Sequence, residues 1–214
     1  MIIQTYRDLD ALPSRLNLYG ASDYATMEPE KGKKEPDFTE HGVWGVDAIG
    51  DLWAVDWWFG QKETDVGVRE FLRLVGLYKP RKWWNEGGVI DKGIAPFIRD
   101  AMRRKQKFVS IEVLPSIEDK GTKLIAFHAR ATSGTVHFPI RRPWADRVID
   151  QLVKFPSGRF DDAADVCGLI GRGVDKMMDA KLPSRAKPDI LTPFTEKWLT
   201  YNDREQQPEV RYFP

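Results

Sequence analysis

The sequence predicts an α/β domain with a mixed β-sheet, and three observations carry this prediction. The chain has 214 residues, 42% hydrophobic and 30% charged, which suits one good-sized domain with a packed core. Aromatic and β-branched runs dominate the first third, and helical spacing of apolar residues follows. Strands that pair as a hairpin, followed by strands alternating with helices, are typical of a mixed sheet flanked by helices.

The predicted strands are short apolar runs that end at glycine, proline or charged residues. The clearest is the segment 42–59, where two aromatic runs are separated by Ile49, Gly50 and Asp51, a pattern typical of a β-hairpin. A shorter run ends at Asp23. We expect strands at residues 16–23, 42–49, 52–59, 81–88, 108–114 and 134–138.

The predicted helices follow the 3.6-residue period. Apolar residues recur at helical spacing from Val68 to Val75, Thr64 precedes them as the expected N-cap, and Pro80 follows as a stop. We expect helices at residues 65–77, 90–105, 119–130, 143–154 and 161–178.

Composition divides the chain into a domain and a tail. Residues 1–182 form the predicted domain, with a charged, proline-containing loop at 27–37 that offers little to a core. Residues 183–214 contain five prolines and are expected to form a C-terminal tail. No run approaches eighteen apolar residues and the start lacks a signal-peptide pattern, so membrane insertion and secretion are not expected.

Cysteine, histidine and net charge restrict the chemistry. One cysteine and three widely spaced histidines argue against a zinc site of the Cys/His type, so any metal must be held mainly by carboxylates. The 33 basic and 32 acidic residues give a net charge of +1, which by itself predicts no polyanion partner. The same balance arises when acids fill the centre of a nuclease site and bases surround it.

Acidic residues stand where predicted elements end or begin. Asp23 and Glu86 close strands, and the pair Asp161 and Asp162 opens the last helix, where Asp165 follows one turn later. Converging carboxylates repel one another unless divalent cations neutralise them, and two Mg²⁺ or Mn²⁺ ions can cleave a phosphodiester. A plain N-cap role is the alternative for Asp161.

Basic and aromatic residues allow two interpretations each. Arg103, Arg104, Arg141 and Arg142 are candidate phosphate contacts, although such runs are usually solvated helix ends. Tryptophans could stack on single-stranded bases, but their place inside predicted strands favours packing in the core. Asp47 and Asp56 could join the acids, although alternation favours solvent.

Six short motifs in a fixed order resemble the nuclease domain of the large terminase subunit of tailed double-stranded DNA phages. The resemblance extends over residues 20–174. The motifs are Gly20-Ala-Ser-Asp23-Tyr-Ala25, Trp84-Asn-Glu86-Gly87, Asp119-Lys120, Gly134-Thr-Val-His-Phe-Pro139, Phe155-Pro-Ser-Gly158 and Asp161-Asp162-Ala-Ala-Asp165.

The resemblance implies an RNase H-like fold and a metal-dependent endonuclease that cuts concatemeric viral DNA during genome packaging. It implies that the metal ligands are Asp23, Glu86, Asp161 and Asp162, with Asp165 as a further acidic position. It also favours Arg130 as a DNA contact.

Two departures concern the residues around the site. Phe160 stands where many members have histidine, and Lys123 where arginine is frequent. The first leaves the proton-transfer partner open, and the second weakens a DNA-gripping role for Lys123.

The expected partners are double-stranded DNA, the portal and the small terminase subunit, in the host cytoplasm. The family's large subunit also has an ATPase, but this chain contains no P-loop motif, which fits either an excised domain or a stand-alone nuclease. Another RNase H-like nuclease, of the junction resolvase or integrase type, is one alternative. A DNA- or portal-docking module that does not cut is the other.

Overall fold

The computed structural model describes residues 4–6, 12–25, 37–117 and 119–181. The loop predicted at 27–37, apart from Asp37, and the tail predicted at 183–214 lie outside the described residues. Within this part of the chain, no helix combines the length and the apolar character that crossing a membrane requires.

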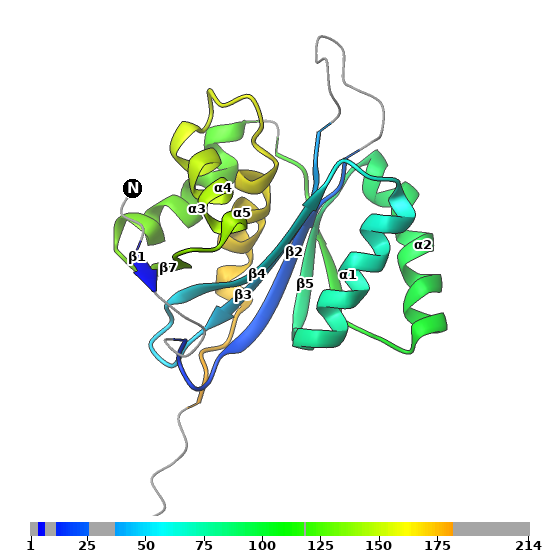
Figure 1. Cartoon of the computed structure of the whole chain (residues 1–214), viewed down its shortest axis with the longest axis horizontal. Helices are drawn as coiled ribbons and strands as arrows, with labels where there is room; N and C mark the ends of the chain where they lie inside the picture. The colour runs from blue at the N-terminus through cyan, green and yellow to red at the C-terminus, as the bar shows by residue number, and fades with distance from the viewer. Residues whose placement is uncertain (1–3, 7–11, 26–36, 118, 182–214) are drawn as a thin grey trace, which may run out of the picture. The chain divides into compact units, whose positions relative to one another are not determined.

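The described residues form one mixed seven-stranded sheet, in the spatial order β1-β7-β4-β3-β2-β5-β6 (Figure 1). The pairs β2–β3 and β3–β4 are antiparallel, and the other neighbouring strands are parallel. The strands are β1 (Gln4–Tyr6), β2 (Asn17–Asp23), β3 (Thr39–Val46), β4 (Leu52–Gly60), β5 (Lys82–Glu86), β6 (Ile111–Leu114) and β7 (Val136–Pro139).

Helices cover both faces of the sheet, which confirms the predicted α/β class with an RNase H-like mixed sheet. Helices α1 and α2 lie on one face, and α3, α4 and α5 lie on the other (Figure 1). The helices are α1 (Thr64–Tyr78), α2 (Val89–Lys105), α3 (Lys120–Thr132), α4 (Pro143–Lys154) and α5 (Asp162–Gly173), with a short 3₁₀ turn η2 (Val174–Lys176).

Alternation along the central strands divides the apolar side chains between two cores. Ala21 of β2 and Trp84 of β5 pack with Phe127 on the side of α3 to α5. Trp83 packs with Phe71 on the side of α1 and α2. Because successive residues of a strand point to opposite faces, the residue after each of these positions belongs to the other face.

Most predicted elements are present, and α4 has the predicted bounds. The strand predicted at 42–49 was placed three residues late, because the Asp47 carboxylate accepts the backbone N–H groups of Ile49 and Asp51 and closes the turn. Thr64 is the first residue of α1, and Glu63 takes the N-cap position. The helix predicted to reach residue 178 ends at Gly173.

The buried tryptophans confirm the core interpretation. Trp44, Trp83 and Trp84 are completely buried, and Trp57 is nearly so. Trp53, partly exposed, stacks on His137 with the ring centroids 4.0 Å apart.

Candidate active site

Strands β2 and β5 bring Asp23 and Glu86 to the same edge of the sheet. The two strands are parallel, and Ser22 pairs with Asn85, so Asp23 and Glu86 are the next residues along each strand. Both follow a residue that points to the α1 and α2 side, so both face α3 and α5. Residues far apart in the sequence therefore become neighbours.

Helix α5 adds its acidic first turn to this pair. Its first residue is Asp162, and Asp161 takes the N-cap position. Burial raises the pKa of Asp23 above its usual value, and the negative charges of Asp165, Asp162 and Glu86 raise it further. The acids predicted to converge from three separate elements thus lie within electrostatic reach of one another.

Lys123 of α3 lies among these carboxylates, which the sequence patterns did not predict. Its Nζ atom is 3.0 Å from Glu86 Oε2 and 3.4 Å from Asp165 Oδ1. All three side chains are largely buried, with exposed fractions of 15% to 17%. We define the acidic cluster as Asp23, Glu86, Asp162 and Asp165, with Lys123 as its cation.

Glycines in α5 explain how α3 comes close enough to place Lys123 there. A Cβ atom on Gly168 would lie 2.9 Å from the carbonyl oxygen of Lys123, and one on Gly171 would lie 2.5 Å from the backbone nitrogen of Phe127. Only glycine permits so close a crossing of two helix backbones. The spacing Gly-x-x-Gly was the available sequence signal for this contact.

The carboxylates of α5 are held in unfavourable surroundings for a negative charge. The pKa of Asp165 rises to about 6 because of burial, with Asp161 and Glu86 adding to the rise and Lys123 opposing it. The pKa of Asp162 rises to about 8 because of burial and the nearby charge of Glu40. Both carboxylates therefore favour a further positive charge beside them.

Asp162 is buried, and its two oxygens differ. Oδ1 accepts the backbone N–H of Phe38 at 3.2 Å, whereas Oδ2 has no hydrogen-bond partner among the residues that the structure describes. Its neighbour Glu40, also missed by the sequence patterns, is fully buried and satisfied by Arg147 and Trp57. An unpartnered buried carboxylate oxygen is costly unless a cation or a donor reaches it.

The donor chemistry of the cluster fits hard divalent cations. Carboxylate oxygens are the ligands that Mg²⁺ and Mn²⁺ prefer, and the unpartnered Asp162 Oδ2 is such an oxygen. In the described part of the chain, no group of three histidine, cysteine or acidic side chains is arranged to hold an ion. Lys123 instead contributes the positive charge.

The predicted DNA-contact arginines lie away from the cluster. Arg130 donates to the carbonyl oxygen of Gly50, in the β3–β4 hairpin at the opposite end of β3 from Asp23. Arg103 and Arg104 lie in the last turn of α2, whose first turn follows Glu86. Arg141 and Arg142, both exposed, precede α4.

Asp47 and Asp56, which could have joined the acids, are engaged elsewhere. Asp47 holds the hairpin turn and accepts the indole N–H of Trp53. Asp56 accepts the hydroxyl of Tyr78 at 3.0 Å.

A buried serine–histidine pair on the other face of β2 is structural. Trp83 Nε1–H donates to Ser22 Oγ at 2.7 Å, and Ser22 lies 2.7 Å from His41 Nδ1. His41 Nε2 contacts the Gly67 carbonyl, which can only accept, so Nε2 carries the proton and Nδ1 accepts from Ser22. Every member of this chain has a partner, and the hydroxyl is buried in the core.

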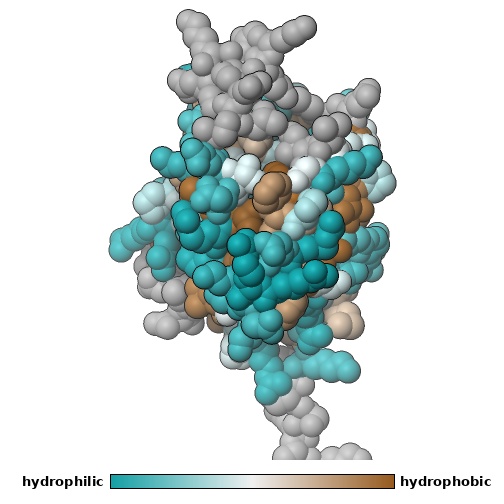
Figure 2. Space-filling view, turned by 90° about the vertical axis from the view of Figure 1, so that its right-hand side faces the viewer, coloured by the Kyte–Doolittle hydropathy of each residue, from teal (hydrophilic) through white to brown (hydrophobic). Residues whose placement is uncertain are grey.

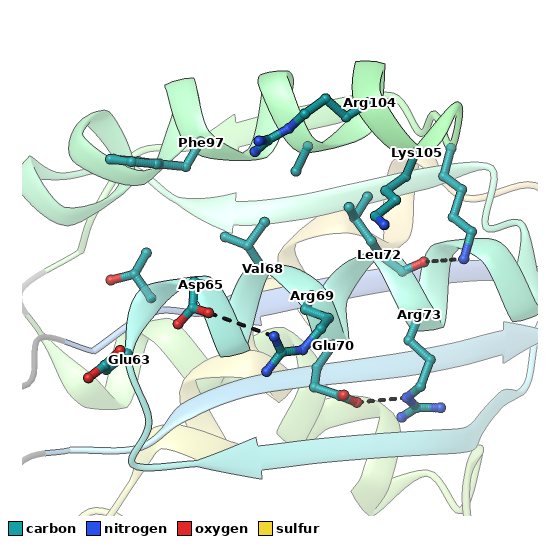
Figure 3. A pocket seen from close by; sticks show the side chains of 13 residues that line it. Glu63, Asp65, Val68, Arg69, Glu70, Leu72, Arg73, Phe97, Arg104 and Lys105 are labelled. Carbon is teal, nitrogen blue, oxygen red and sulfur yellow. Dashed lines mark hydrogen bonds and ion pairs between the residues drawn. The ribbon is translucent and has the colours of Figure 1, made fainter.

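A groove between α1 and α2 lies on the face opposite the acidic cluster. It has a volume of about 1010 Å³ and an apolar floor that includes Val68, Leu72 and the exposed Phe97 (Figure 3). Figure 2 shows apolar surface exposed between hydrophilic side chains on this face. Arg73 on its rim is paired with Glu70 at 2.7 Å. The groove therefore lacks the crowded carboxylates of the opposite face.

Comparisons with known proteins show where this fold occurs. No protein-family model matches the sequence, and neither does any curated protein. The large terminase nuclease of the thermophilic phage G20c, solved with bound zinc, aligns with a TM-score of 0.54 at 14% identity, over 79% of this chain and 91% of its own. The chain has the fold of a large terminase nuclease domain.

Two further structures with the terminase nuclease fold agree. The Thermus phage P74-26 large terminase nuclease domain aligns with a TM-score of 0.52 at 13% identity, over 85% of this chain and 95% of its own. The large terminase of another thermophilic bacteriophage, in complex with ADP, gives 0.52 and 13%, over 79% of this chain and 42% of its own. The resemblance seen in the sequence motifs is thus confirmed for the fold.

Proposed function

We propose that this chain is a metal-dependent DNA endonuclease that cuts concatemeric viral DNA during genome packaging. The observation that carries the proposal is the convergence of carboxylates from β2, β5 and α5 on the edge of the sheet where both parallel strands end. Carboxylates crowded in this way bind divalent cations, which in turn bind phosphate oxygens. The terminase nuclease fold supports this choice among acidic sites.

The proposed metal ligands are Asp23, Glu86, Asp161 and Asp162, with Asp165 beside them. The electrostatic neighbours of Asp23 include Asp165 and Asp162, so we rank Asp165 as a ligand candidate equal to Asp161. Two Mg²⁺ or Mn²⁺ ions, when bound, would activate water and stabilise the departing oxygen. The G20c nuclease was also solved with bound magnesium, which supports a divalent ion in this fold.

Double-stranded DNA is the proposed substrate, and the host cytoplasm during phage assembly is the proposed setting. The portal and the small terminase subunit are the proposed partners. A cluster with four carboxylates and one lysine repels a phosphate backbone until cations neutralise it. An isolated nuclease domain without its motor should hold DNA weakly, so we expect slow cleavage that needs high metal concentrations.

Plasmid nicking with Mg²⁺ or Mn²⁺ tests the proposal. Asp23→Ala and Asp162→Ala should reduce nicking to the level seen without protein, because each removes a ligand candidate. Asp150→Asn is the matched control, since this exposed acid of α4 pairs with Lys154 at 2.8 Å on the helix surface and should leave nicking unchanged. Undiminished cleavage by both alanine variants would refute the assignment, and a marked preference for branched DNA would favour a junction resolvase.

A further inference from the structure

The acidic cluster contains its own cation. Lys123 Nζ bridges a strand carboxylate, Glu86, and a helix carboxylate, Asp165, at 3.0 and 3.4 Å. Its charge also acts favourably on Asp23. One ammonium group thus contacts or faces acids from three elements that would otherwise repel one another.

The backbone of Lys123 is fixed, whereas its ammonium group is not. The close crossing at Gly168 fixes the main chain, and α3 begins just before it at Asp119, whose carboxylate accepts the N–H of Thr122 at 2.7 Å. The four-carbon stem of a lysine still allows the ammonium to move away without any backbone change. The position of the charge is therefore defined but reversible.

Glu86 is the carboxylate on which lysine and metal would compete. Its Oε1 accepts the Ser116 hydroxyl at 2.7 Å, and its Oε2 faces Lys123. A divalent cation near Glu86 and Asp165 would meet a positive charge already paired with both. Like charges at such distances repel strongly in a partly buried site.

We propose that Lys123 is a built-in competitor for the metal: its ammonium holds Glu86 and Asp165 in place while no ion is bound, and a divalent cation must displace it from both carboxylates. This inference rests on the proposed function, because it assumes that the acidic cluster binds divalent ions. Lys123 is thus a positioning residue that sets metal affinity and keeps the repelling acids together in the metal-free protein.

Isothermal titration of the protein with Mn²⁺ alone, without DNA, tests this role. Lys123→Met keeps the stem and removes the charge, so it should lower the dissociation constant for Mn²⁺ at least tenfold while lowering the melting temperature of the metal-free protein. Lys123→Arg keeps the charge and should bind Mn²⁺ no more tightly than wild type does. A merely structural ion pair predicts the reverse, since losing it would loosen Glu86 and Asp165 and weaken Mn²⁺ binding.

A second lysine provides the matched control. Lys82 begins β5, the strand that Glu86 ends, and pairs with Glu112 at 2.8 Å in a similarly part-buried setting. Lys82→Met should lower stability and leave Mn²⁺ affinity unchanged. Equal tightening by Lys82→Met, or equal tightening by Lys123→Arg, would overturn the proposal.

Two other results have different meanings. Mn²⁺ binding to wild type that is equal to or tighter than binding to Lys123→Met overturns the role of Lys123 and leaves the nuclease proposal standing. No Mn²⁺ binding by either protein overturns both.

Should Lys123→Met fail to fold, NMR of lysine side chains in the wild type replaces it. Mg²⁺ should then shift the Lys123 Cε signal towards that of an exposed lysine, and an unchanged signal at saturating Mg²⁺ would refute displacement.

Discussion

Ser22 and Asp23 are adjacent in β2, yet they enter opposite kinds of polar environment. Ser22 points to the α1 and α2 face and joins the chain from Trp83 through His41 to the Gly67 carbonyl. In that chain each donor has an acceptor, with distances of 2.7 to 3.0 Å. Such a network stabilises one conformation and needs nothing from outside.

Asp23 points to the other face, where charges outnumber partners. Its neighbours are three carboxylates and one lysine, and burial together with those negative charges raises its pKa. The nearby Asp162 keeps one oxygen without a partner among the described residues. A satisfied buried network thus serves the fold, whereas an unsatisfied one at a strand end is where a ligand gains most.

The largest effect is expected from breaking the satisfied network. Ser22→Ala leaves the Trp83 N–H and His41 Nδ1 buried without partners, at roughly 1 to 3 kcal/mol each. We expect a loss of about 4 kcal/mol in the free energy of unfolding, measured by urea denaturation. Ser133→Ala, an exposed helix-end serine, is the control and should change it by less than about 0.5 kcal/mol. A loss below about 1 kcal/mol for Ser22→Ala would show that this network is dispensable.

The helix crossing beneath the acidic cluster should be nearly as sensitive. Gly171→Ala forces a Cβ atom against the Phe127 backbone and should destabilise the protein by about 3 kcal/mol. Gly93→Ala is the control in α2, where a Cβ would meet nothing within 4 Å, and it should stabilise by about 0.5 to 1 kcal/mol. Equal effects of the two substitutions in urea denaturation would contradict the close crossing.

His41 makes the satisfied network sensitive to acid. Burial lowers the pKa of His41 to about 4, below the unfolded value, so the unfolded chain takes up a proton first as the pH falls. Its contribution is present above about pH 6.5 and lost towards pH 4, amounting to about 2 kcal/mol at pH 5. The carboxylates with raised pKa values act in the opposite direction, so the difference between wild type and His41→Gln isolates it. Parallel pH profiles of unfolding for the two proteins would contradict this assignment.

Local patterns predicted the elements and the acids that end them. Asp23 and Glu86 stand where an apolar run meets a charge, and alternation alone places both on one face. The bounds of α4 follow from Pro143 and the helical period. The three-residue strand β1 was missed, because it is too short for any period to be visible.

The partners within the site could not be predicted in the same way. Lys123 meets Asp165 only because Gly168 and Gly171 let two helices cross closely, and the spacing of residues within each helix does not reveal the crossing. Likewise, Glu40 is buried by Arg147, 107 positions away. Charge pairs between distant elements depend on packing, which local sequence patterns do not encode.

The smallest expected change has the most informative sign. Asp23→Asn keeps the shape and removes one negative charge from the acidic cluster, so it should stabilise the metal-free protein by about 1 kcal/mol at pH 8. A carboxylate whose folded pKa is raised destabilises the fold once ionised, so this gain should shrink as the pH falls towards 4. Asp150→Asn should instead cost about 0.3 to 0.5 kcal/mol, because it breaks an exposed pair with Lys154. Destabilisation by Asp23→Asn in metal-free urea denaturation at pH 8 would mean that the carboxylate at position 23 is as well satisfied as its neighbour Ser22, and the contrast between the two faces would fail.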